Sequence, residues 1–151
     1  MINRRHVLLA ASAALLAPAA CAAPPARPMQ VYKHASCGCC SAWIDHITKA
    51  GFKADAENVD DLGAVKTKYG VPDDLASCHT GVIDGYVVEG HVPAVDVARL
   101  LKERPKAIGI AVGGMPVNSP GMEVPGAPDE PYTVWLFQKD GTRTAFATHG
   151  S

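Results

Sequence analysis

Three cysteines stand within four residues, in the segment Cys37–Cys40. A further cysteine, Cys78, stands much later in the chain and is followed directly by His79. Core packing explains this density poorly, because a buried free cysteine packs as one small apolar residue. Thiolates are the nucleophiles of disulfide exchange and also the ligands of soft metals. The pattern therefore predicts soft-metal binding, thiol redox chemistry, or both.

The middle cysteine of the segment separates these two readings. In a plain thiol–disulfide oxidoreductase, Cys37 attacks and Cys40 resolves, so Cys39 has no role. Soft sulfur selects Cu(I), zinc or an iron–sulfur cluster, and four sulfurs with a nearby histidine also suit tetrahedral zinc. Zinc sites usually present two separated pairs of ligands, whereas three ligands in four residues favour a multinuclear Cu(I) thiolate cluster. Zinc, an iron–sulfur cluster and metal-free redox chemistry at Cys37 and Cys40 stay open as alternatives.

Several other side chains are candidates for an auxiliary role at such a site. Two of these candidates are histidines, His79 and His34. The other two are methionines of a Gly/Pro-rich segment, Met115 and Met122, whose thioether sulfurs could serve as soft ligands. We expect His46 to be solvated, His91 to end a hairpin without a chemical role, and Trp43 to belong to the core.

The elements that must position these residues can be read from periodicity. Strand alternation covers 29–34, and apolar residues at helical spacing follow the cysteine segment as far as Gly51. A short strand is expected within 52–59, then a helix capped by Asp60 or Asp61 and ended by Gly70. Asp84-Gly85 predicts the turn of a hairpin over 81–90. A helix over 95–104, a Gly/Pro-rich excursion over 108–131 and strands over 132–137 and 144–147 complete the chain.

This order predicts an α/β fold of the thioredoxin-like type: a central mixed β-sheet flanked by helices, with the CxCC segment at the N-terminus of the first helix. A helix N-terminus stabilises thiolates there. Glutaredoxin-like chains carry Thr-Val-Pro shortly before an Ile-Asp-Gly turn, and that proline lies against the CxxC pair. Matching 83–85 to this turn puts His79 at the proline position. We therefore expect Cys78 and His79 beside the cysteine segment.

The first residues have the pattern of an export signal. A basic start is followed by a short apolar run over 7–16 and by small residues around Cys21, which predicts a signal peptide over 1–22. The run is too short for a good membrane span. Arg4 and Arg5 also fit the twin-arginine route. We expect Cys21 to be removed with the signal; lipid attachment at this cysteine is the alternative, which Pro18 disfavours.

The rest of the chain divides into an Ala/Pro-rich spacer over 23–28 and one metal-binding domain over 29–151. Acidic side chains outnumber Lys and Arg by 15 to 14, and no basic stripe is present, so nothing favours nucleic acid or an anionic membrane as a partner. Exported proteins often carry disulfide frameworks, but frameworks spread their cysteines. If the segment holds a disulfide, Cys37–Cys40 is favoured over a strained vicinal bridge.

Linked motifs then give a family resemblance over roughly residues 29–149. They are Val31–His34, Cys37–Cys40 with Trp43, Gly70–Pro72, Leu75–Thr80, Asp84–Pro93, Gly114–Pro116 and Ser119–Met122. In these the chain resembles the CopG-like bacterial copper-resistance proteins, long known only as a metal-binding domain of unknown function. The resemblance implies a periplasmic thioredoxin-like protein that binds Cu(I) through Cys37, Cys39, Cys40 and Cys78. It also implies an oxidoreductase role in copper handling, with copper ions and other periplasmic copper-handling proteins as partners.

Overall fold

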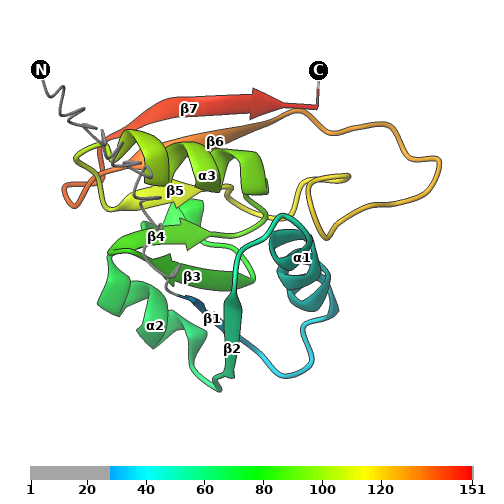
Figure 1. Ribbon diagram of the computed structural model, residues 1–151, viewed down its shortest axis with the longest axis horizontal. Helices are drawn as coiled ribbons and strands as arrows, with labels where there is room; N and C mark the ends of the chain where they lie inside the picture. Colours follow the sequence, from blue (N-terminus) through cyan, green and yellow to red (C-terminus); the bar gives the residue numbers. More distant parts are fainter. Residues whose placement is uncertain (1–27, 151) are drawn as a thin grey trace, which may run out of the picture.

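The computed structural model describes residues 28–150, and the expected export signal, Cys21 and nearly all of the spacer lie outside them. The elements in chain order are β1 (Met29–Lys33), α1 (Gly38–Lys49), β2 (Ala54–Asn58), α2 (Leu62–Tyr69), the 3-10 turn η1 (Asp73–Leu75), β3 (His79–Ile83), β4 (Tyr86–Glu89), α3 (Ala94–Glu103), β5 (Gly109–Ala111), β6 (Tyr132–Phe137) and β7 (Arg143–His149). Figure 1 shows this path from the blue β1 to the red β7.

All of these strands join one mixed sheet in the order β2-β1-β3-β4-β5-β6-β7. The pairs β1–β2 and β4–β5 are parallel, and the other neighbours are antiparallel. Helix α1 begins at Gly38, so the cysteine segment spans its first turn. The predicted α/β class, the central mixed sheet and the place of the CxCC segment are therefore confirmed.

The two faces of the sheet carry separate apolar clusters, because successive side chains of a strand point to opposite faces. Val88 lies in the larger cluster, with Trp43 of α1 and Leu100 of α3. Its neighbour Val87 lies in the smaller cluster, with Phe137, on the face of the sheet that α2 covers. Helices α1 and α3 thus cover one face, and the segment from α2 to η1 packs on the other.

Local signals explain where the first elements stop and turn. Asp61 Oδ1 accepts a hydrogen bond of 2.9 Å from Ala64 N at the start of α2, and Gly70 ends this helix in the left-handed region at φ 72°. The hairpin turn has positive φ at both central residues, 48° at Asp84 and 86° at Gly85. This is the conformation that a two-residue turn between twisted strands requires, so the sequence predicted both features correctly.

The Gly/Pro-rich segment expected over 108–131 contains one strand that the sequence analysis missed. β5 has only three residues, yet it lies between β4 and β6 and joins the hairpin to the last two strands. A Cβ atom at Gly109 would overlap the Val87 carbonyl, so glycine allows this close approach. Among the helices of residues 28–150, none has the length and apolar character that crossing a membrane requires.

Candidate metal centre

Strand pairing brings the distant cysteine to the cysteine segment. Cys37 is the N-cap residue of α1, directly after the short turn that follows β1. The antiparallel pairing of β1 with β3 sets Lys33 opposite His79. Cys78, one residue before β3, consequently lies at the same edge of the sheet as the start of α1.

The four sulfur atoms of this edge lie within 4.8 Å of one another. Cys39 Sγ is central, at 3.6 Å from Cys37 Sγ and 3.6 Å from Cys78 Sγ. Cys37 and Cys40 are joined by a disulfide, while Cys39 and Cys78 are free thiols. The sulfur of Cys40 lies 3.3 Å from the carbonyl oxygen of Cys78. Residues from two parts of the chain therefore form one compact sulfur cluster.

Cys78 is held as a thiol in this structure. Burial, followed by the contact with Cys39, raises the pKa of the Cys78 thiol to about 12. Its sulfur lies 3.0 Å from His91 Nε2. The other ring nitrogen of His91, Nδ1, lies 2.8 Å from the Pro120 carbonyl oxygen. Because a carbonyl only accepts, Nδ1 carries the proton and Nε2 accepts from the thiol.

His91 was expected to end the hairpin without a chemical role, and the structure places it in contact with Cys78. Its side chain is fully buried and faces Cys78. His91 is the second residue after β4, where the chain leaves the sheet and contacts the loop around Pro120. No local pattern distinguishes a buried histidine at this position, although His91 lies within the Asp84–Pro93 motif.

His79 lies deeper in the same site. Its side chain is fully buried, Nδ1 is 3.3 Å from Cys78 Sγ, and Nε2 has no hydrogen-bond partner among the described residues. The ring packs on the indole of Trp43 with 4.3 Å between centroids. Burial is the main cause that lowers the pKa of His79 to about 3, so its imidazole is neutral. Trp43 belongs to the core as predicted, and its Nε1 donates to the Val92 carbonyl over 2.8 Å.

The remaining auxiliary candidates lie around the cluster. The His34 side chain is exposed and is not among the groups whose ligand atoms converge within residues 28–150. Met115 is 52% exposed and Met122 is half-buried. Both follow glycines that contact the site: the Gly114 carbonyl accepts from Ser77 Oγ, and Gly121 packs on the first turns of α1. The segment 113–122 thus lies over the cluster.

His46 is a further correction, since it is not simply solvated. Its Nε2 accepts a hydrogen bond of 3.0 Å from the backbone N–H of Ala94, the first residue of α3. Burial lowers the pKa of His46 from its ordinary value. This histidine therefore caps α3 and ties it to α1 in its neutral form.

A buried ion pair supports the Cys78 segment from the opposite face of the sheet. Glu89 is fully buried, and Lys66 Nζ donates to its Oε1 over 2.5 Å. The same carboxylate accepts 2.7 Å hydrogen bonds from Ser77 N and from Thr80 Oγ1. The residues on both sides of Cys78–His79 are therefore fixed to one buried carboxylate, a network that the sequence analysis did not predict.

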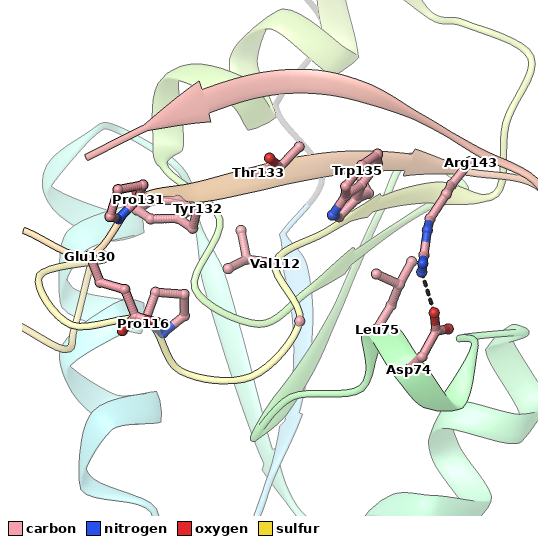
Figure 2. A pocket seen from close by; sticks show the side chains of 11 residues that line it. Asp74, Leu75, Val112, Pro116, Glu130, Pro131, Tyr132, Thr133, Trp135 and Arg143 are labelled. Atoms are coloured by element: carbon pink, nitrogen blue, oxygen red, sulfur yellow. Dashed lines mark hydrogen bonds and ion pairs between the residues drawn. The ribbon is translucent and has the colours of Figure 1, made fainter. Parts of the chain in front are cut away.

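A separate cleft of about 310 Å³ lies beside Leu75, Val112 and Trp135, and Figure 2 shows its lining with the Arg143–Asp74 ion pair at one end. No cysteine or histidine lines this cleft. The concentration of reactive side chains therefore lies at the sulfur cluster and not at this hollow.

Comparisons with known proteins bear on the same region. A family model described as a protein of unknown function, DUF411, matches residues 75–122, which include Cys78, the hairpin and the segment over the cluster. A solved structure named "Copper resistance protein copG- Form 1" is 44% identical, with 83% of this chain and 99% of that chain covered and a TM-score of 0.78. Its Form 2 is 45% identical, with 82% and 99% covered and a TM-score of 0.76. No curated protein matches the chain.

Proposed function

The chain belongs to the CopG family of copper resistance proteins, and from this premise we propose that it binds Cu(I) in a cluster formed by Cys37, Cys39, Cys40 and Cys78. The observation that carries the proposal is the convergence of these four sulfurs within 4.8 Å. Soft thiolates select Cu(I), and a thiolate can bridge neighbouring ions. Adjacent cysteines on one helix turn therefore favour several copper ions over one.

The donor set fits copper once the disulfide is open. Reduction of the Cys37–Cys40 bridge by a dithiol takes two electrons and two protons and leaves four thiols at one place. Metal binding then displaces their protons. The N-terminus of α1 favours the resulting negative charge on the first-turn sulfurs. At Cys78 the metal has to displace the proton of a thiol whose pKa is raised to about 12 by burial.

The finer parts of the proposal concern fold type, location and further ligands. The order from β1 to α3, with α1 and α3 on one face, supports a thioredoxin-like unit within a domain over 29–151. The export pattern over 1–22 supports a periplasmic place of action. Met115 and Met122 would add thioether ligands from the segment over the cluster. Exposed His34 would serve only as an outer ligand.

The Cys37–Cys40 bridge favours a second candidate, thiol–disulfide oxidoreductase activity. Cys37 is partly exposed whereas Cys40 is fully buried, so an incoming thiolate reaches Cys37 first. Attack at Cys37 Sγ breaks the bridge and releases Cys40 as thiolate. A second substrate thiolate then displaces Cys37, which leaves a reduced pair and an oxidised substrate. A redox role toward copper would use the same pair.

An anaerobic Cu(I) titration of the reduced protein tests the copper proposal. Several Cu(I) ions per chain, protection of four thiols and sulfur-to-copper charge-transfer absorption are expected. Cys39→Ser and Cys78→Ser should each lower the copper stoichiometry, and Ser36→Ala, an exposed neighbour, should not.

The same variants separate the alternatives. The oxidoreductase candidate predicts that Cys39→Ser keeps disulfide exchange, because Cys39 takes no part in the bridge. If reduced protein binds no Cu(I) while the bridge cycles readily, the copper proposal fails and the enzyme remains. Binding of a single zinc ion, with unfolding on chelation, would instead favour a structural zinc domain.

A further inference from the structure

The cleft of about 310 Å³ beside β6 lies where β5 and β6 separate. β5 pairs with β6 only over Trp135–Phe137, and no backbone hydrogen bond joins Val112 or Gly113 to β6 within residues 28–150. The chain turns instead toward η1, where a Cβ atom at Gly113 would lie 3.2 Å from the Asp74 carbonyl oxygen. A hollow therefore stays open between this turn and the first half of β6, and its volume is at the lower end of the range of small-molecule sites.

The lining of this cleft is aromatic in the middle and charged at both ends. Figure 2 shows Trp135 between the Arg143–Asp74 ion pair at one end and Glu130 at the other. The guanidinium of Arg143 lies over the Trp135 ring, 5.3 Å from its centroid, and the indole is only half-buried. The negative face of an aromatic ring attracts cations in this way. The indole therefore already contacts one cation of the protein itself.

The charges that line the cleft do not balance. Arg143 and Asp74 neutralise each other, whereas Glu130 forms no ion pair with a Lys, Arg or His of the described part of the chain. Glu130 Oε2 accepts a hydrogen bond of 2.9 Å from Val117 N, and the Glu130 backbone N–H donates to the Val117 carbonyl. The carboxylate is thus held at the wall of the cleft. Since the segment 113–131 contains no Lys or Arg, the negative charge at this end is uncompensated.

Tyr132, which also lines the cleft, experiences charge of the same sign. Burial raises the pKa of this phenol to about 12, and three carboxylates add to the rise: Asp96, Asp129 and Glu123. Nearby negative charge disfavours the tyrosinate, so the raised pKa supports a negative potential at this wall. A cation is therefore attracted to the Glu130 end of the cleft, and an anion is repelled from it.

We propose that this cleft binds an elongated organic cation, an alkylammonium or alkylguanidinium group, with its methylene chain over Trp135 and its charged head at Glu130. Methylene groups pack on apolar surface while the charged head stays in contact with water, as the stems of Lys and Arg do. A free linear diamine and a Lys or Arg side chain of another protein share this chemistry. The inference is independent of copper, because no residue that lines the cleft belongs to the sulfur cluster.

NMR titration of the whole, copper-free protein tests the proposal, because its two tryptophans give two indole N–H signals. Trp43 is fully buried in the apolar cluster on the other face of the sheet, so its signal is the internal reference. With 1,5-diaminopentane, the Trp135 signal should shift and saturate with a Kd of about 1 mM or below. The uncharged 1,5-pentanediol, of equal length, should leave the signal in place.

Two matched variants test the role of the carboxylate. Glu130→Gln keeps an acceptor for Val117 N and removes the charge, so the diamine should bind about fivefold more weakly. Glu57→Gln removes an exposed carboxylate from β2, at the opposite edge of the sheet, and should bind the diamine as wild type does.

N-acetyl-lysine methylamide distinguishes the two sources of the cation. A diamine that binds about tenfold more tightly than this single-headed compound assigns the cleft to a free diamine, and equal affinities assign it to a side chain of a partner protein. If the diol shifts the Trp135 signal as the diamine does, or if Glu130→Gln binds the diamine as wild type does, the proposal is wrong. It also falls if neither cation moves the signal. Should Glu130→Gln not fold, the comparison of diamine and diol in the wild-type protein still decides.

Discussion

Replacing Lys66 by methionine tests how the Cys78 segment is held. The variant keeps the length and apolar stem of the side chain but removes the ammonium group from Glu89. The carboxylate, fully buried, then retains only the hydrogen bonds from Ser77 N and Thr80 Oγ1. Removing one partner of a buried ion pair costs about 3–5 kcal/mol of folding free energy, because the other charge is left uncompensated.

The structure places the expected value in the lower part of this range. The Lys66 side chain is 13% exposed, so water can reach the space that the ammonium group leaves. A loss of about 3 kcal/mol is therefore expected for Lys66→Met. For a domain of this size, it corresponds to a decrease in Tm of roughly 10–15 °C. Lys68→Met, an exposed lysine on the same helix, should stay within about 0.5 kcal/mol of wild type.

The pKa of Glu89 determines how the stability deficit of Lys66→Met changes with pH. Burial is the main cause that raises the pKa of Glu89 above its ordinary 4.5, and the charge of Lys66 opposes this rise. A carboxyl with a raised pKa in the folded state favours folding below its ordinary pKa, and this contribution is lost as pH rises. Without Lys66 the pKa rises further. The deficit of Lys66→Met should therefore be large at pH 7.5 and shrink as the pH falls toward 4.5.

Urea unfolding at pH 7.5 and pH 5 is the assay, with wild type, Lys66→Met, Glu89→Gln and the double variant. The amide oxygen of glutamine still accepts from Ser77 N and carries no charge, so the double variant should be more stable than Lys66→Met alone. Copper stoichiometry is measured in parallel, because Ser77 precedes Cys78. A deficit below about 1 kcal/mol at pH 7.5, or one that is the same at both pH values, refutes the reasoning from a buried uncompensated charge.

Two further predictions concern the elements around the site. His46→Ala removes the acceptor for Ala94 N and should lower the unfolding free energy by about 1 kcal/mol at pH 8. Because burial lowers the pKa of His46, this contribution is present above its ordinary 6.5 and lost on acidification; an equal deficit at pH 8 and pH 5 in urea unfolding would contradict it. Gly121→Ala puts a Cβ atom 2.7 Å from Trp43 N at a φ of +87°. It should cost at least about 2 kcal/mol by the same assay, from overpacking and left-handed strain. Gly126→Ala at φ +81°, with open space around it, isolates the strain alone, and equal losses in the two variants would show that the packing of this segment on α1 is unimportant.

Much of the fold was predictable because its signals are local. Alternation and helical spacing identified the strands and α-helices from β1 to α3, though not the 3-10 turn η1, and the Asp84-Gly85 turn matched its conformation. β5 was missed because three residues are too few for a periodic pattern. Its strand character comes from pairing with β4 and β6, which no local signal reveals.

The residues of the candidate site also divide into those with a local sequence signal and those without one. The cysteine segment is visible in the sequence, and a register argument from the hairpin turn placed Cys78 beside it. His91 and the Lys66–Glu89 pair were not predicted, because their roles depend on burial and on partners far away in the chain. His46 was missed for the same reason: its partner is a backbone N–H on another helix.

The pairing of β1 with β3 would also make the proposed copper cargo a ligand of the native state. Cys40 and Cys78 are 38 residues apart in the chain. Closing a loop of this length costs an unfolded chain about 3 kcal/mol of free energy through lost chain entropy. In the folded chain the two cysteines are already close, so metal binding does not include this cost. Recruitment of the fourth sulfur should therefore be about a hundredfold more favourable in the folded protein. By linkage, copper bound as proposed would raise the free energy of global unfolding by a similar amount. The copper supply would then set how long the chain survives proteolysis, in addition to how much metal it carries.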